Sequence, residues 1–356
     1  MNPVFQRAEQ FCARFGLRVP ILLAPMAGAS APPLSIAVAN AGGLGACGAL
    51  LMKPEEILAW AEEVRRGTRG PFQINLWIPD PPPKRDREQE ARVREFLSGW
   101  GPRVAEDAGE AVPPEFSAQC EALLRAAPAI VSSVMGLYPP EFVKELKRRG
   151  MAWWANISTV AEARAAEAAG ADVVVAQGME AGGHRGCFDA AQAETQQVGL
   201  FSLLPAVVDA VKVPVVATGG IADARGVAAA LVLGASAAQV GTAFLVCPEA
   251  KIHPAWAAAL VKAAPEDTVV SRVFSGRAGR SLRTDYVRAA TAPNAPAPAP
   301  YPVQRGLTAT MRAEAQKAGD VQRMQAWAGQ SAGLAKAEPA ADVVSRLWEG
   351  AKGLLG

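Results

Sequence analysis

Eight short apolar runs, each followed by a segment with helical spacing, constrain the fold of this 356-residue chain more than any other feature. The runs are continuous in apolar residues, which is the pattern of strands buried on both faces of a parallel sheet. Their alternation with helices predicts an α/β fold closed into a (β/α)8 TIM barrel, with an open doubly wound sheet as the alternative. The predicted strands span residues 21–25, 43–47, 72–76, 129–133, 151–155, 172–176, 214–218 and 237–241.

Between these runs, alanine, leucine, glutamate and arginine recur at the spacing of an amphipathic helix. In one segment, Ser158 is expected to cap the helix at its start and Gly170 to end it. The predicted helices span residues 33–41, 54–66, 115–126, 139–149, 158–169, 199–211, 222–233 and 254–263.

Two regions do not fit the repeat. Residues 79–114 are too long for an ordinary connection and contain a helical segment of their own, which predicts an insertion or lid after the third strand. After residue 265 come an extended piece, a proline-alanine stretch and a final pair of helices. We therefore expect residues 1–265 to form the barrel and residues 266–356 to be an extension that packs on the barrel mouth.

Charge and cysteine content exclude several functions. Lys and Arg number 36 against 34 Asp and Glu, and the mixed run at 84–95 alternates in sign, which indicates a solvated helix face and no nucleic-acid surface. The five cysteines are widely spaced without a metal-ligand pattern, so we expect no metal and a reducing compartment. No secretory leader or long apolar stretch is present, which predicts a cytoplasmic protein without a membrane segment.

Glycines gather where the last predicted strands end. Gly219 and Gly220 precede one predicted helix, and Gly241 with Thr242 precedes another helical turn. Unblocked backbone N–H groups at helix starts bind phosphate, and phosphate-binding barrels hold their ligand after these strands. The segment "GLGACG" at 43–48 matches a dinucleotide-binding spacing, but it follows a helix, so close packing of a strand is the favoured explanation.

His184 is the candidate catalytic residue, because it lies in "QGMEAGGHRG", residues 177–186, directly after the sixth predicted strand. An imidazole at the catalytic face of a barrel can hold or move a proton. His253 is expected to cap a helix or line the outer ring, and Glu180 either orients His184 or pairs with an arginine. No metal-ligand or nucleophile motif occurs, so the chemistry is expected to come from a phosphate-bearing organic cofactor.

The chain resembles the nitronate monooxygenase family, formerly called 2-nitropropane dioxygenases, which are FMN-dependent (β/α)8 barrels. The resemblance runs from about residue 20 to about 335 and is strongest at 177–186 and 214–245. It rests on "ILLAPMAGAS", "GGLGACGAL", "FQINL", "QGMEAGGHRG", "PVVATGGIADARGVAAALVLGASAAQVGTAFL", "SGRAGRSL" and "WAGQS". The FMN contacts that it implies fall on Asn75, Gln177, Gly182, Gly220, Gln239, Val240, Gly241 and Thr242, with Pro25 and Met26 against the isoalloxazine ring.

The resemblance implies oxidation of an alkyl nitronate, or of a nitroalkane, by O2 to a carbonyl compound and nitrite. His184 would stabilise the anionic nitronate, or act as base toward a neutral nitroalkane. Well-known members carry a further histidine after the fourth strand, where this chain has Ser133, Val134 and Met135. Tyr301 and Trp256 are the candidate substrate contacts, and the substrate pocket therefore differs from the family pattern.

Two other functions stay open at this point. An NAD(P)H-dependent flavin reductase, similar to the flavin enoyl-acyl-carrier-protein reductases, shares the barrel and the glycine-histidine loop. A non-catalytic FMN-binding or phosphate-ligand-binding protein is the third possibility. In each case we expect a monomer or a homodimer.

Overall fold

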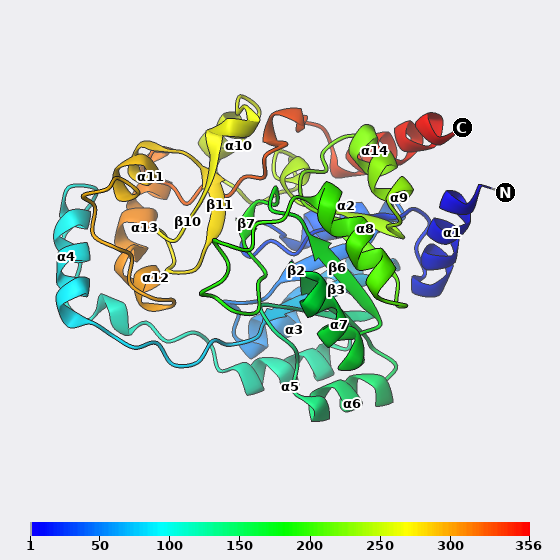
Figure 1. Ribbon diagram of the computed structural model, residues 1–356, viewed down its shortest axis with the longest axis horizontal. Coiled ribbons are helices and arrows are strands. Elements are labelled where there is room, and N and C mark those ends of the chain that lie inside the picture. The colour runs from blue at the N-terminus through cyan, green and yellow to red at the C-terminus, as the bar shows by residue number, and fades with distance from the viewer. Residues whose placement is uncertain (1) are drawn as a thin grey trace.

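The computed structural model describes residues 2–356 and contains an eight-stranded parallel barrel (Figure 1). The strand order is β1-β9-β8-β6-β5-β4-β3-β2, and a parallel bridge between Leu22 and Leu44 brings β1 beside β2 and closes the ring. Each predicted run holds a strand, so the predicted (β/α)8 TIM barrel is confirmed. The strands are β1 (Ile21–Leu23), β2 (Gly45–Gly48), β3 (Phe72–Trp77), β4 (Ile130–Val134), β5 (Ala152–Ile157), β6 (Val173–Gln177), β8 (Val215–Thr218) and β9 (Ala237–Val240).

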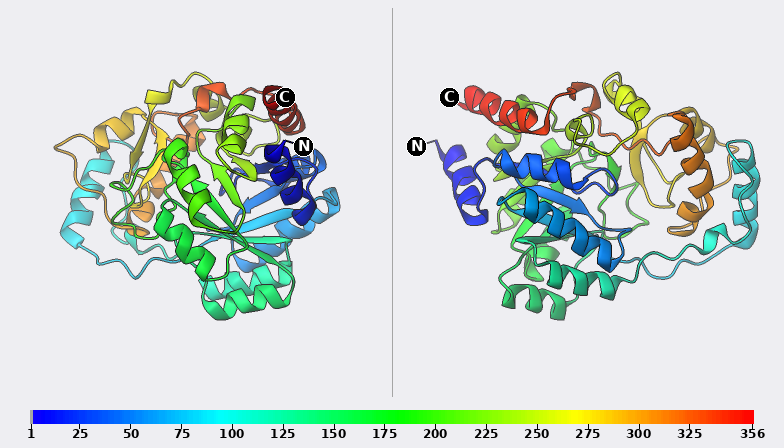
Figure 2. Two further views of the ribbon diagram at one scale, coloured as in Figure 1. Left: turned by 45° about the vertical axis from the view of Figure 1, so that its right-hand side comes forward. Right: turned by 180° about the vertical axis from the view of Figure 1, so that it is seen from behind.

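Helices surround this barrel and cover its outer surface (Figures 1 and 2). Their buried faces pack on the outward-facing apolar residues of the strands, which form one large hydrophobic core with them. The outer helices are α2 (Pro32–Asn40), α3 (Pro54–Gly67), α5 (Phe116–Ala126), α6 (Pro140–Arg148), α7 (Val160–Ala168), α8 (Leu200–Ala210), α9 (Ala224–Val232) and α14 (Ala340–Leu355).

The eighth position of the helical ring differs from the prediction. A helix does form within 254–263, namely α10 (Pro254–Leu260), but it packs with the C-terminal extension over the barrel mouth. The place between α9 and α2 is taken by α14, which contacts both of them and β1. Helical periodicity identifies a buried face but not the partner that buries it, so α10 and α14 could not be told apart from their sequences.

Two local predictions have clear outcomes. The N-cap of α7 is Thr159, whose side chain accepts from Glu162 N, and not Ser158; the predicted cap was wrong by one residue because Ser158 donates to the Glu162 carboxylate instead. Close packing at the 43–48 glycines is confirmed, because a Cβ on Gly48 would lie 2.6 Å from the backbone nitrogen of Ala27.

Helix α1 (Pro3–Phe15) closes the N-terminal end of the barrel. Phe11 and Phe15 pack on Trp154 inside the barrel, with ring centroids 5.5 and 5.0 Å away. These rings join the inward-facing apolar residues of several strands in one buried cluster. The lower end of the barrel is thus filled with apolar side chains, which leaves the opposite end, where the strands finish, for a ligand.

The insertion lies beside residues 268–318 of the C-terminal extension at the end of the molecule far from α1, whereas α14, the last helix of the extension, lies at the same end as α1 (Figures 1 and 2). Val93 and Leu97 of α4 (Arg87–Ser98) share a hydrophobic cluster with Val303 and Leu307 of α12 (Val303–Leu307). The extension also holds α11 (Asp285–Ala290), α13 (Ala309–Ala318) and the strands β10 (Thr268–Ser271) and β11 (Gly279–Leu282). These two strands form an antiparallel sheet with β7 (Gly183–His184), which belongs to the loop after β6. Short 3-10 helices occur at η1 (Ala108–Glu110), η2 (Thr242–Phe244), η3 (Pro265–Asp267) and η4 (Ala332–Leu334).

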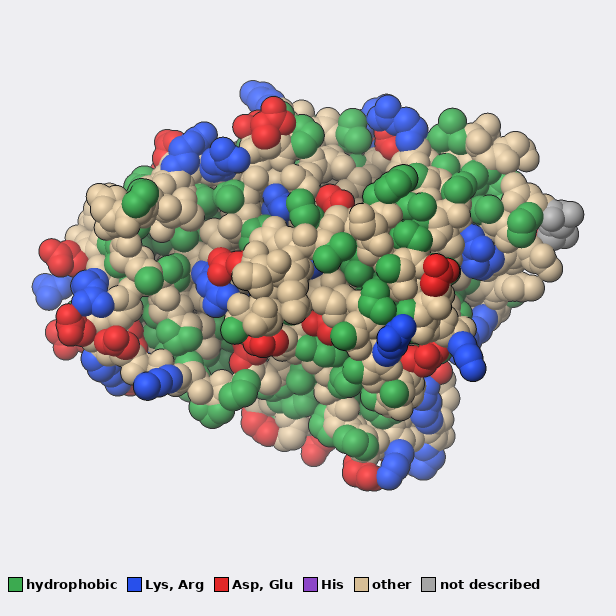
Figure 3. Space-filling view, in the orientation of Figure 1, with side chains coloured by type: hydrophobic (Ala, Val, Ile, Leu, Met, Phe, Trp, Pro, Cys, Tyr) green, Lys and Arg blue, Asp and Glu red, His purple; other side chains and the backbone are tan. Residues whose placement is uncertain are grey.

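The mixed-charge run forms most of α4. Glu88 and Arg92 are exposed and paired at 2.7 Å, and acidic and basic side chains alternate over this part of the face in Figure 3. Glu90 departs from the predicted solvated face, because it is 1% exposed and bonded to Arg85. Within residues 2–356, no helix combines the length and apolar character needed to cross a membrane.

Candidate active site

A cavity of about 620 Å³ opens where the barrel strands end. Its floor and sides come from β1, β3, β4, β5, β6, β8, β9 and their loops, and its roof comes from the C-terminal extension. The volume is in the range of a small-molecule or cofactor site. The cavity lies at the end of the barrel that carries the active site in TIM-barrel enzymes.

Amide side chains form the floor of the cavity. Gln73 Nε2 donates to Leu23 O at 3.3 Å and to Gln239 Oε1 at 3.1 Å, and Asn75 Nδ2 donates to Ser132 Oγ at 3.1 Å. Two buried polar atoms on this floor have no hydrogen-bond partner among the described residues: Gln73 Oε1 and Asn156 Nδ2. Such orphaned atoms are rare in folded proteins, so the floor offers one acceptor and one donor to a bound molecule.

The side chain of Gln177 holds the histidine loop. Its Nε2 donates to His184 O at 3.1 Å, and its Oε1 accepts from Gly186 N at 2.7 Å. The buried Arg185 donates to the backbone oxygen of Gln177 at 3.0 Å. Gln177 therefore lines the cavity, and the hydrogen bonds of its amide lie within the loop and fix the direction of His184.

The predicted phosphate loops lie together at one end of the cavity. Gly219 and Gly220 have φ of 113° and 71°, a conformation that favours glycine. Within residues 2–356, the backbone N–H groups of Gly219, Gly220, Gly241 and Thr242 donate to no hydrogen bond. Four free N–H groups from two neighbouring loops make a site suited to a phosphate.

A segment of the extension closes over these loops. Ser331 Oγ donates to Gly220 O at 2.6 Å, and Gly329 N donates to Thr242 Oγ1 at 3.0 Å. Gly182 has no room for a side chain, because its Cβ would lie 2.5 Å from Gly329 N. The glycine at position 182 thus permits contact with the roof of the cavity.

His184 is held at the cavity wall by three neighbours. Its Nε2 lies 2.7 Å from Ser275 Oγ, and its ring meets the rings of Trp77 and Trp327 edge-on at 4.7 Å. Pairing of β7 with β11 fixes the backbone, with His184 opposite Gly279. Each contact comes from a different part of the chain, so the ring position depends on the whole roof.

Burial lowers the pKa of His184 to about 3, and three nearby guanidinium groups act in the same direction. They belong to Arg277, Arg305 and Arg312. The imidazole is therefore neutral near pH 7 and offers a hydrogen bond instead of a positive charge.

Two arginines that sequence reasoning missed supply the positive charge at this cavity. Arg305 and Arg312 both line it, and neither has a carboxylate within 4 Å in the part of the chain that the structure describes. Arg312 is positioned by Arg305 O at 2.8 Å, Thr308 Oγ1 at 3.1 Å and Gln325 Oε1 at 3.3 Å. Burial lowers the pKa of Arg312 to about 10, so it stays charged at neutral pH.

Gln325 adds a further donor beside this pair. Its Nε2 is buried and has no partner among the described residues. Two unpaired guanidinium groups and a free amide donor in one cavity form a binding site for an anion.

The remaining predicted residues fall in three places. Pro25, Met26 and Trp256 line the cavity, with Trp256 Nε1 donating to Trp327 O at 3.2 Å. Val240 lies in the hydrophobic core, so its side chain does not reach the cavity. Tyr301 lines a second, neighbouring cavity and contacts Trp77, with ring centroids 5.4 Å apart.

Two further polar residues, Glu180 and His253, are not among the described residues that line the cavity. Glu180 neither orients His184 nor forms an ion pair with an arginine; its carboxylate accepts from Leu200 N at 2.9 and 3.0 Å at the start of α8. His253 caps α10 as predicted, its Nδ1 accepting from Ala255 N at 3.1 Å.

Comparisons with known proteins point to one family. The nitronate monooxygenase family model matches residues 10–350. A nitronate monooxygenase from Paraburkholderia phytofirmans is 38% identical over 342 residues, which are 93% of this chain and 92% of that protein. The solved structure of nitroalkane oxidase from Streptomyces ansochromogenes has a TM-score of 0.85 at 36% identity, covering 96% of this chain and 98% of that chain. The solved structure of FabK from Thermotoga maritima has a TM-score of 0.76 at 30% identity, covering 97% of this chain and 96% of that chain.

Proposed function

The chain belongs to the nitronate monooxygenase family of oxidoreductases, and on this basis we propose that it uses FMN and O2 to oxidise an alkyl nitronate to a carbonyl compound and nitrite. The observation that carries the proposal is that Arg305 and Arg312, neither of which has a carboxylate partner among the described residues, line the same cavity of about 620 Å³ as His184. The reductase alternative is less favoured, because the similarity to FabK is lower than that to nitroalkane oxidase in both structure and sequence.

The donors and acceptors of the cavity fit FMN. The free N–H groups of Gly219, Gly220, Gly241 and Thr242 would hold its phosphate. At the other end, Gln73 Oε1 and Asn156 Nδ2 would meet polar edges of the ring system, which satisfies the two orphaned atoms. When bound, the flavin supplies the electron transfer and oxygen chemistry that no side chain here provides.

Arg305 and Arg312 would bind the substrate as an anion. A nitronate carries its negative charge on the nitro oxygens, and a bidentate guanidinium suits two such oxygens. Gln325 Nε2 is available as a third donor. A neutral thioester substrate would leave these charges without a counterion, which is costly in a partly buried site.

His184 would act as a neutral hydrogen-bonding group beside the substrate. Its pKa of about 3 makes it a weak base, and a weak base removes a carbon-bound proton poorly. A nitronate has already lost that proton, so the chain would favour the nitronate over the neutral nitroalkane. The contact with Ser275 would keep the imidazole in one orientation during turnover.

We also propose that the enzyme is cytoplasmic and acts as a monomer or homodimer. The five cysteines are all buried and unpaired, which agrees with a reducing compartment.

The test is a direct comparison of substrates with the purified protein. We expect a flavin absorption spectrum, release of FMN on denaturation, and oxygen uptake with nitrite release when ethyl nitronate is added. The rate with neutral nitroethane should be lower by at least about tenfold. A protein without flavin, or one whose flavin is bleached rapidly by NADPH without air and which ignores nitronates, would overturn the proposal.

A further inference from the structure

A second cavity of about 570 Å³ lies beside the active site. Apolar groups form most of its wall, and the two cavities share Leu50 and Trp77. The wall is built by the start of the insertion, the segment around η1, and the beginning of α12. Its apolar members include Ile78, Val112, Phe116, Val303 and the prolines 79, 81–83, 113 and 114.

We propose that this second cavity binds the hydrophobic tail of the substrate, so that the enzyme acts on nitronates with an alkyl chain of several carbons or an aryl group. The inference rests on the proposed function, because the anionic head is placed at Arg305 and His184. The tail would pass Leu50 and Trp77, the residues that the two cavities share.

The apolar rim supports an apolar ligand. Val112 lines the second cavity and is 88% exposed, and Leu51 at the edge of the first cavity is 39% exposed. Apolar side chains left in water beside a cavity are typical of a ligand-binding surface, because a bound apolar group removes both surfaces from water.

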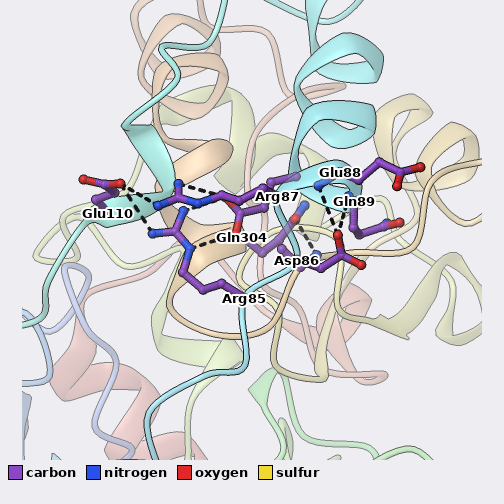
Figure 4. A network of polar contacts seen from close by, with 9 residues as sticks. Arg85, Asp86, Arg87, Glu88, Gln89, Glu110 and Gln304 are labelled. Atoms are coloured by element: carbon purple, nitrogen blue, oxygen red, sulfur yellow. Dashed lines mark hydrogen bonds and ion pairs between the residues drawn. The ribbon is translucent and has the colours of Figure 1, made fainter.

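Ion pairs fix the wall of the second cavity before any ligand binds. Arg85 Nε and Nη2 bond to the two Glu90 carboxylate oxygens at 2.8 and 2.5 Å, and Glu90 is 1% exposed. Glu110 lies 3.8 Å from Arg85 and 3.0 Å from Arg87, which joins the start of α4 to η1 (Figure 4). A preformed wall lowers the ordering cost of binding.

Trp77, which lines both cavities, lies between His184 and Tyr301. The Trp77 ring contacts His184 at 4.7 Å on one side and Tyr301 at 5.4 Å on the other. The hydroxyl of Tyr301 is buried without a hydrogen-bond partner among the described residues, which marks a place for a ligand or a water molecule. The candidate substrate contact Tyr301 therefore falls on the tail side of the proposed site.

The experiment measures kcat/KM for primary alkyl nitronates from ethyl to octyl. Burying one methylene is worth about a fourfold change in affinity, so kcat/KM should rise by about that factor per carbon over at least three successive members. Two variants narrow the cavity: Ile78→Trp inside it, and Val112→Trp at its exposed rim, where folding is not at risk. In both, octyl nitronate should lose at least tenfold more in kcat/KM than ethyl nitronate does.

Val232→Trp is the matched control, because Val232 is 61% exposed on α9 and lines neither cavity. In Val232→Trp, kcat/KM should rise with chain length from ethyl to octyl nitronate as it does in the wild-type protein. Binding of 1-octanol, followed by calorimetry, gives a readout independent of turnover: the wild-type protein and Val232→Trp should bind it, and Val112→Trp should bind it at least tenfold more weakly.

The two proposals fail in different ways. If ethyl nitronate is oxidised but kcat/KM is flat along the series and 1-octanol does not bind, the tail site is wrong and the proposed function stands. If no nitronate is oxidised, the proposed function falls, and the tail site falls with it as a substrate site, even where 1-octanol binding shows an apolar cavity.

Discussion

Arg305 and Arg312 face the same cavity as His184 and give it a positive potential. Their charges help to keep the imidazole neutral, so the group that binds an anion and the group that offers a neutral hydrogen bond are different residues. This division of roles leads to two predictions at the scale of single residues.

Replacing Arg312 should weaken substrate binding more than turnover. In Arg312→Ala, KM for ethyl nitronate should rise roughly 10- to 100-fold, which matches the about 1.5–3 kcal/mol of a hydrogen bond to a charged group. Steady-state oxygen uptake gives KM and kcat, and Arg92→Ala on the exposed side of α4 is the control. An unchanged KM in Arg312→Ala would remove this residue from the substrate site.

The pH dependence of stability should report the environment of His184. Its pKa is about 3 in the folded chain against an ordinary value of 6.5, so between these pH values the unfolded state binds the additional proton. Stability is therefore lost as pH falls below about 6.5, and His184→Asn should remove that loss. On going from about pH 7.5 to about pH 5, the free energy of unfolding measured in urea should fall by about 1–2 kcal/mol more in the wild-type protein than in His184→Asn, from ~1.4 kcal/mol per pKa unit. An equal fall in the two proteins would contradict the neutral imidazole.

At the scale of elements, the chain predicts its strands better than its helix partners. Largely apolar runs locate each barrel strand, because most side chains of a strand buried on both faces pack in an apolar environment. The glycines that follow the strands locate the phosphate loops for a similarly local reason, the need for positive φ and free N–H groups. Arg305 and Arg312 give no such signal, since they come from the extension and reach the site through packing that no spacing encodes.

Helix α14 shows the same limit and carries a prediction of its own. Leu347 is fully buried where α14 takes the eighth ring position, whereas Leu354 on the same helix is 58% exposed. Leu347→Ala should destabilise the protein by about 2–5 kcal/mol, and Leu354→Ala by less than about 0.5 kcal/mol. Thermal or urea unfolding compares the two, and equal effects would mean that α14 is not part of the barrel wall in solution.

At the scale of the whole molecule, the insertion and the extension form one roof over both cavities. Asp80 at the start of the insertion lies 3.2 Å from Arg277, which follows β10 and is 2% exposed. Arg277 also donates to Cys187 O at 3.2 Å in the loop that carries His184. One buried guanidinium thus connects the insertion, the extension and the histidine loop.

Breaking this ion pair should open the roof without unfolding the barrel. Asp80→Asn leaves Arg277 buried and without its counterion. Removal of one partner of a fully buried pair costs about 3–5 kcal/mol, and because Asp80 is 23% exposed the cost here should be lower, about 1–3 kcal/mol. That cost should fall on the roof, because Asp80 belongs to the insertion and Arg277 to the extension. Hydrogen exchange followed by mass spectrometry should become faster in residues 79–114 and 183–189 and stay unchanged in β4 and β5.

Asp285→Asn is the control, because the ion pair of Asp285 with Arg288 is 3.4 Å long and both side chains are more than half exposed. This variant should leave hydrogen exchange unaltered. Faster exchange across the whole barrel would mean that the pair stabilises the fold as a unit, whereas no change in 79–114 would mean that the roof is held by its hydrophobic cluster alone.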